Sequence, residues 1–228
     1  MEALKAIVAV EHESDSSRRA ETLIVGFGAP AAARLASLAG DSRWFAQRAA
    51  ARILGRIGRP DSVPLLQPLL RRTDPRVARE AVAALAAIDD PSAARAIHTV
   101  LRAATGDLRI AVVDALVADR DPRVVPMLAR ILGESEPLGK DHQVVIETLG
   151  ALGAVRHDAA IGPIENVIKI RRFFGRKKLR ALKESGVAAL VAIGTPKAEA
   201  ALDVAKKTGD RMLRKAIQST KYKGQSTK

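Results

Sequence analysis

The chain has 228 residues, of which 47% are hydrophobic and 28% are charged, so it can bury a sizeable core and extensive disorder is not expected. Aromatic residues make up only 3% and cysteine is absent, which excludes disulfides, thiolate metal sites and a cysteine nucleophile. The formal net charge of +13 predicts a positive field that attracts acidic proteins or nucleic acid.

The first residues differ from the rest of the chain. Residues 1–10 have an apolar pattern that predicts one helix, and residues 11–19 are predicted to be a polar linker. We expect residues 1–19 to be a partial repeat unit, or the chain to be the C-terminal part of a longer ancestor. The apolar run Ala6–Val10 is too short for a signal-peptide core, and no stretch is long enough to span a membrane. We therefore expect a cytoplasmic protein.

From residue 20 onward one sequence pattern recurs. A stretch rich in small residues leads to an aliphatic residue, which is followed by a glycine or polar residue and often by proline. Anchored on the aliphatic residue, the copies fall at positions 24, 54, 85, 116, 149 and 190, in steps of 30, 31, 31, 33 and 41 residues. These lengths suit two short helices and two turns, so residues 20–217 are predicted to form about six helix pairs.

The clearest unit shows how a helix pair is encoded. Asp74 is a predicted N-cap and Pro75 the first helical residue. The apolar residues that follow have helical spacing and need a buried face; they are Val77, Ala81, Val82, Leu85 and Ile88.

The preceding helix is predicted to begin at Asp61–Pro64. It carries four leucines that we expect to point inward, namely Leu65, Leu66, Leu69 and Leu70. Small residues are predicted to let neighbouring helices approach closely; they are Ala49, Ala50, Ala81, Ala84, Ala188 and Ala189.

These units resemble HEAT repeats, particularly the short bacterial kind that is also seen in phycobilisome lyase subunits. The resemblance covers about residues 20–217. It implies an all-α fold, a right-handed α-solenoid of stacked antiparallel helix pairs, whose concave face and loops offer a large binding surface. The shared pattern is structural and carries no chemistry.

The last step of the repeat contains an insertion, Ile170–Arg180, in which cations surround two aromatic residues. Cations hold phosphates and rings stack or wedge, so this is our first-ranked contact site. In the alternative reading the aromatics plug the junction between layers and the cations are solvated. The candidate residues are Arg171, Arg172, Phe173, Phe174, Arg176, Lys177, Lys178 and Arg180, with Lys169 and Lys183 at the margins.

A second basic feature lies on the helix that contains Trp44. Arg48, Arg52 and Arg56 are spaced by four residues and share one face; with Arg76, Arg79 and Arg109 they form a basic groove, or else they pair with acidic residues such as Asp41, Asp74, Glu80 and Asp114. Trp44 is either an exposed anchor for a partner or a packing residue.

No constellation of catalytic residues is found. The four histidines are scattered, and the only His-Glu pair, His12-Glu13, contrasts with the repeated pairs of the iron-binding HEAT hydroxylases that this architecture resembles. We therefore expect no catalytic, cofactor or metal site, and we expect that the chain is not an enzyme.

The function predicted from these features is a non-catalytic scaffold or adaptor for a protein partner, favoured by the net charge to be acidic. A nucleic-acid-binding protein is the alternative, and the resemblance also implies a bilin lyase-like, chromophore-handling role. No membrane contact or small-molecule substrate is expected. Residues 218–228 are predicted to be a basic, flexible tail, while the partner, the binding face and the oligomeric state stay open.

Overall fold

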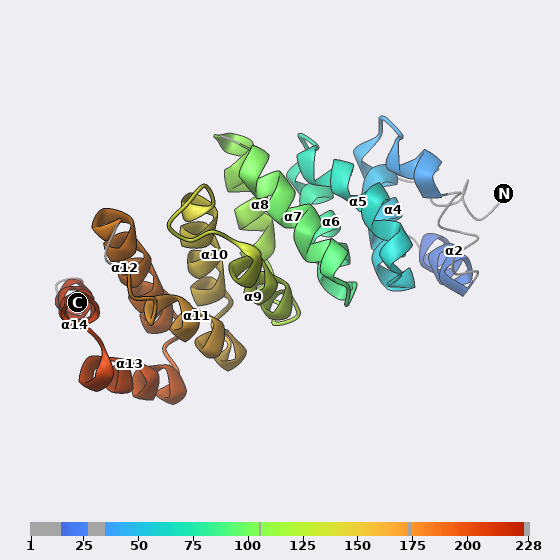
Figure 1. Cartoon of the computed structure of the whole chain (residues 1–228). Helices are drawn as coiled ribbons and strands as arrows, with labels where there is room; N and C mark the ends of the chain where they lie inside the picture. Colours follow the sequence, from blue (N-terminus) through green and yellow to red (C-terminus); the bar gives the residue numbers. More distant parts are fainter. Residues whose placement is uncertain (1–14, 27–34, 105, 173–174, 226–228) are drawn as a thin grey trace. The chain divides into compact units, whose positions relative to one another are not determined.

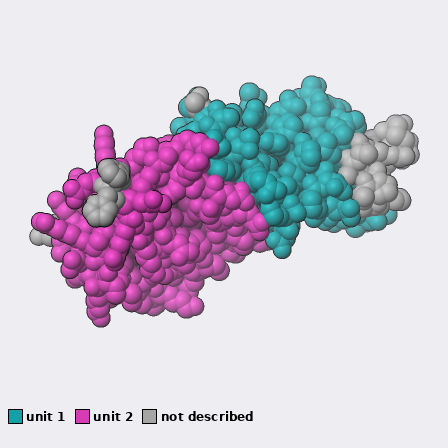
Figure 2. Space-filling view, viewed as in Figure 1, with its two compact units in different colours: residues 1–118 teal, residues 119–228 magenta. Residues whose placement is uncertain are grey.

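The computed structural model describes residues 15–26, 35–104, 106–172 and 175–225, and every regular element in these ranges is helical (Figure 1). The chain divides into two compact units, Met1–Ala118 and Asp119–Lys228 (Figure 2). The helices of each unit lie in two layers. The predicted all-α fold of stacked helix pairs is confirmed.

In unit 1 one layer is a row of helices in successive contact, which we call the second-helix row of that unit. It comprises α4 (Trp44–Ile57), α6 (Pro75–Ala87) and α8 (Asp107–Val117). The other layer comprises α5 (Val63–Leu66), the 3₁₀ helix Gln67–Arg71 and α7 (Pro91–Ala103). Helix α2 (Asp15–Gly26) and a helical stretch at residues 35–39 precede α4, and the 3₁₀ turn Pro60–Ser62 directly precedes α5.

Unit 2 repeats this arrangement. Its second-helix row comprises α10 (His142–Val155), α12 (Arg176–Ile193) and α14 (Arg211–Gln225). Its other layer comprises α9 (Val124–Glu134), α11 (Ile161–Ile168), preceded by the 3₁₀ turn Asp158–Ala160, and α13 (Pro196–Thr208).

Helix α6 follows the start and stop signals of its sequence. The Asp74 carboxylate accepts a hydrogen bond from the Arg76 backbone N–H at 2.9 Å, which caps the helix where Pro75 begins it. Asp90 caps α7 in the same way, accepting from the Ser92 N–H at 2.8 Å. The predicted stripe of α6 is buried, with Val77 and Leu85 fully inaccessible.

The helix before α6 is less regular than predicted. The segment changes from α-helix to 3₁₀ helix after Leu66, because Pro68 has no N–H to donate and its ring clashes with the carbonyl of Pro64 four residues earlier. Leu66, Leu69 and Leu70 are fully buried. The inward position predicted for Leu65 is wrong, since that side chain is only half-buried.

Two helix contacts in the second-helix rows are close enough to require glycine. A Cβ on Gly55 would lie 2.6 Å from the Ala84 Cα, and a Cβ on Gly153 would lie 2.8 Å from the Ala189 Cα. Real Cβ atoms do not approach other atoms this closely, so a glycine of one helix and an alanine of the next set the spacing. Ala188, which was predicted to share this role, is exposed.

Backbone conformation corrects the register of one repeat. Gly58, Arg156 and Gly194 follow α4, α10 and α12 with positive φ angles of 67°, 55° and 68°. Each lies four residues after a buried leucine, and in α10 that leucine is Leu152 rather than the predicted Leu149. Two successive steps, 116 to 152 and 152 to 190, are therefore longer than the rest, and the surplus is divided between the connections at residues 135–141 and 169–175.

The ends of the repeat region also differ from expectation. Helix α2 begins at Asp15, inside the segment predicted to be a polar linker, and α14 continues to Gln225, beyond residue 218 where the flexible tail was predicted to begin. The predicted helix at residues 1–10 lies outside the described residues.

A local motif, Asp-x-Arg, precedes three of the helices. The Arg43 side chain donates to Asp41 at 3.0 and 2.8 Å, Arg76 donates to Asp74 at 3.1 and 2.8 Å, and Arg123 donates to Asp121 at 2.7 Å. These charge-assisted bonds lower the pKa of Asp41 to about 2 and lower the pKa values of Asp74 and Asp121.

The spacing glycine of α10 provides a test of the close contact. Gly153→Ala is expected to destabilise the protein by roughly 1–3 kcal/mol, because its methyl group overlaps Ala189. Gly150→Ala in the same helix meets no atom within 4 Å and is expected to stabilise by about 0.5–1 kcal/mol. Urea denaturation measures both, and equal effects would contradict the proposed spacing role.

The Asp-x-Arg caps predict loss of stability in acid. Their carboxylate pKa values are lower in the folded chain than the value near 3.9 of an unfolded one, so their contribution is complete above about pH 4 and is lost as the pH falls toward about 2. Arg43→Met is expected to lower the urea midpoint at about pH 5 and to lower it less near pH 2. A difference that stays constant with pH would show that the Asp41 pair contributes nothing.

Candidate functional site

The basic insertion lies between α11 and α12 of unit 2. Helix α12 begins after Gly175, which has a φ of 74° and offers no side-chain cap, and its first turn holds Arg176, Lys177 and Lys178 with no acidic residue. Cations at the positive end of a helix dipole are electrostatically unfavourable. The sequence of this helix start therefore does not serve helix stability.

Two cations fasten the insertion to neighbouring segments. The Arg171 guanidinium donates to the Thr208 carbonyl at 3.5 Å. The Lys178 ammonium donates to the carbonyls of Leu138 and Gly139 at 3.1 and 2.9 Å. The first turn of α12 thus lies beside the connection at residues 135–141, and both cations have structural partners.

Lys183 belongs to the interior of unit 2 and not to the exposed cations with which the sequence grouped it. Its side chain is 1% exposed and its ammonium lies 2.6 Å from an Asp210 carboxylate oxygen. The other Asp210 oxygen accepts the Leu213 N–H at 2.8 Å and caps α14. Burial alone raises the pKa of Asp210, but the bonds from Lys183 and Leu213 outweigh it, and the net pKa is lowered.

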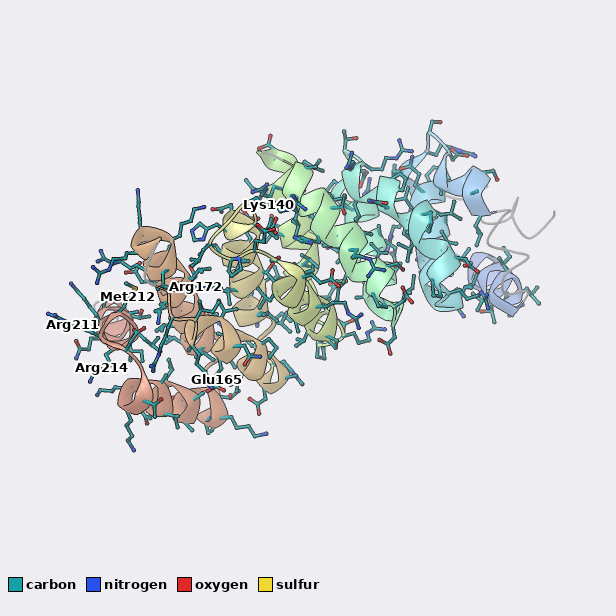
Figure 3. All side chains as sticks on the ribbon, in the orientation of Figure 1. Lys140, Glu165, Arg172, Arg211, Met212 and Arg214 are labelled. Atoms are coloured by element: carbon teal, nitrogen blue, oxygen red, sulfur yellow. The ribbon has the colours of Figure 1, made fainter. Side chains whose placement is uncertain are left out.

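This buried pair brings the start of α14 next to the insertion. Arg211, Arg214 and Lys215 are exposed on the first turns of α14, where Figure 3 labels Arg211 and Arg214. Sequence reasoning missed Arg211, Arg214 and Lys215 as candidate site residues. The available signal was their spacing of three and four residues, which places all three on one helix face.

Seven exposed cationic side chains at this end have no partner among the described residues. None of these side chains forms a hydrogen bond or ion pair within the described ranges; α12 contains a single carboxylate, Glu184, and α14 contains none. We call this cluster the basic end of unit 2. It comprises Arg172, Arg176, Lys177, Arg180, Arg211, Arg214 and Lys215. The predicted residues Phe173 and Phe174 lie outside the described residues.

The arginine stripe of unit 1 is engaged internally. Arg48 pairs with Glu80 of the next helix at 3.0 Å, and Arg56 donates to the Thr22 hydroxyl at 3.4 Å. Arg52, half-buried between them, also has an interaction partner. Arg109 donates to the Ala104 carbonyl at 2.9 Å. The structure therefore places the predicted groove residues on one row of helices. These four arginines already have interaction partners within the chain.

Trp44 is held by its neighbours. Its ring meets the Phe45 ring edge to face at 5.9 Å, and the Arg76 guanidinium lies 3.3 Å from its centroid while also pairing with Asp74. The side chain is half-buried. These contacts favour the packing role over the exposed anchor.

A separate depression of about 260 Å³ lies between α6 and α8. Its wall carries Arg79, Asp107 and Asp114 around Ile110, which is 59% exposed. Because it combines one cation with two carboxylates, this depression does not form a surface for anions.

Metal sites and membrane-spanning helices are two further features by which the described residues can be judged. No group of three or more His, Cys, Asp or Glu side chains in these residues could hold a metal ion. No helix in the described part of the chain is long and apolar enough to cross a membrane.

The buried pair predicts an asymmetry between its two partners. Asp210→Ala is expected to cost roughly 2–4 kcal/mol, because it leaves the inaccessible Lys183 ammonium without a counter-charge. Lys183→Met is expected to cost less, since the Asp210 side chain is 31% exposed and can be hydrated. Thermal or urea unfolding of both variants measures the difference, and a larger loss for Lys183→Met would contradict this account of the pair.

Comparison with known proteins agrees with the repeat architecture. Residues 31–116 match the family model described as HEAT repeats, and no curated protein matches the chain. Human deoxyhypusine hydroxylase in complex with glycerol is a similar solved structure, at 20% identity and a TM-score of 0.38, covering 96% of this chain and 93% of that one. An engineered protein is similar at 21% identity and a TM-score of 0.31, with coverages of 95% and 92%.

The expectation that the chain is not an enzyme is corrected by the first of these structures, which is that of a hydroxylase. The fold by itself neither assigns nor excludes an activity. At this identity and TM-score the likeness transfers no activity to the present chain.

The phycobilisome-lyase subtype stays a prediction, because the matching family model is a general one. The match of residues 31–116, together with the two-layered helix pairs, shows that this chain contains HEAT repeats.

Proposed function

We propose that the chain is a HEAT-repeat scaffold that binds an acidic protein partner through the basic end of unit 2. The observation that carries this proposal is the set of seven exposed Arg and Lys side chains that have no partner among the described residues. Stacked helical repeats present broad surfaces to other macromolecules, and a surface of unpaired cations favours an acidic one.

The distribution of paired and unpaired arginines supports this choice of surface. In unit 1 most of the predicted groove arginines have partners, such as Glu80 for Arg48, while Arg79 is exposed. At the basic end of unit 2 four of the seven cations are arginines of α12 and α14, and a guanidinium fork suits the two oxygens of a carboxylate. Val204 of α13, 51% exposed one turn before Thr208, adds an apolar neighbour for a polypeptide.

Nucleic-acid binding is the second candidate, because the net charge of +13 also attracts phosphates. Proteins that bind single strands stack bases on aromatic side chains. The aromatic pair of the insertion, Phe173 and Phe174, lies outside the described residues, so the two candidates are separated by experiment. We place the acidic protein first because of the fit of guanidinium groups to carboxylates, and a cytoplasmic location belongs to the same proposal.

Charge reversal tests the surface directly. Arg172→Glu/Lys177→Glu is expected to weaken binding of a fluorescein-labelled oligoglutamate by at least about fivefold, because two attractions become repulsions. Fluorescence anisotropy, measured at low and at physiological salt, reports the affinity. The control variant Arg95→Glu/Arg130→Glu changes the net charge equally at exposed arginines outside the basic end and is expected to have a smaller effect.

Two results would overturn the proposal. Equal affinities of the insertion variant and the control would remove the basic end from binding. Tighter binding of an oligonucleotide than of oligoglutamate of matched charge, with a steeper loss of affinity in salt, would replace the acidic protein by nucleic acid.

A further inference from the structure

The cations of α12 and those of α14 face a common region. Arg176, Arg180 and Lys183 are spaced by four and three residues, so they lie along one face of α12. Lys183 on this face is bonded to Asp210, the residue directly before α14. The face of α12 that carries Arg176 and Arg180 therefore leads toward the start of α14.

A second row of cations continues from that point. Arg211, Arg214 and Lys215 share one face of α14 by the same spacing, while Leu213, Ala216 and Ile217 on the opposite face are buried. The Arg171 bond to Thr208 holds the insertion beside this helix start. We refer to Arg176 and Arg180 as the α12 row and to Arg211, Arg214 and Lys215 as the α14 row.

We propose that the α12 row and the α14 row form one continuous surface that binds a single extended acidic polypeptide segment across both helices. This inference rests on the proposed function, and it adds α14 and the form of the ligand. The ion pair of Lys183 and Asp210 holds the two rows next to each other. Because the two charges neutralise each other, this pair does not itself bind the partner.

The spacing of the rows suits an extended chain. Cations one helical turn apart are about 5–6 Å from each other, and carboxylates on alternate residues of an extended segment are about 7 Å apart. Helices in contact are about 8–10 Å apart, so a segment of roughly eight residues can reach both rows. A segment of two or three residues can engage only one.

The test separates the rows and uses an oligoglutamate long enough to reach both. Arg176→Glu/Arg180→Glu and Arg214→Glu/Lys215→Glu are each expected to weaken its binding by at least about fivefold, with a stoichiometry of one peptide per chain by titration calorimetry. For diglutamate, reversal of one row is expected to leave binding at the other. Arg95→Glu/Arg130→Glu is again the control of equal charge.

Folding of the α14 variant is expected to be preserved, because acidic residues are favourable in the first turns of a helix, and Arg214→Gln/Lys215→Gln gives a second variant without added charge. Reversal of the α14 row could change the affinity for oligoglutamate no more than the control does, while reversal of the α12 row weakens it. In that case the proposal of one surface across both helices is wrong and the proposed function stands. If neither row matters, the proposed function itself fails. Two long peptides per chain would also contradict a single spanning ligand.

Discussion

Stacking of one helix pair on the next is the interaction on which the rest of the structure depends. A single pair cannot cover its own apolar stripe, so residues such as Val77 and Leu85 become buried only when neighbouring helices close over them. In both units a glycine facing an alanine permits this approach, Gly55 against Ala84 and Gly153 against Ala189. The stacked helices are consequently constrained along their length, while their connections can vary.

The surplus residues of unit 2 lie in the connections between helices, which are less constrained than the stacked helices. Both long connections fall between helices, where an added residue does not disturb the spacing of the rows, and Lys178 joins α12 to the first connection through backbone carbonyls. Lys183 shows the opposite situation: a cation inside the stack, which is tolerated because Asp210 neutralises it at 2.6 Å. One basic stretch of sequence thus contains cations with structural roles and cations that are open to a partner.

The same division explains why the net charge is a poor guide to the binding surface. In unit 1 arginines cap helices, as Arg76 does with Asp74, or link neighbouring helices, as Arg48 does with Glu80. Their charge is compensated locally and contributes little field at a distance. Exposed arginines without a partner among the described residues occur in unit 1 as well, such as Arg79 and Arg95, but those of α12 and α14 lie on helices with almost no carboxylates.

The helical class, the caps and much of the period follow from the sequence alone, because capping by Asp74 and Asp90 and the apolar spacing of α6 are local properties. The sequence places all the surplus residues in the basic insertion, whereas the structure divides them between two connections. The sequence does not reveal that Leu152 takes the place expected for Leu149, that Lys183 is buried, or that Asp210 brings the start of α14 to α12. Tertiary packing sets these features, since each depends on which residues distant in sequence lie together.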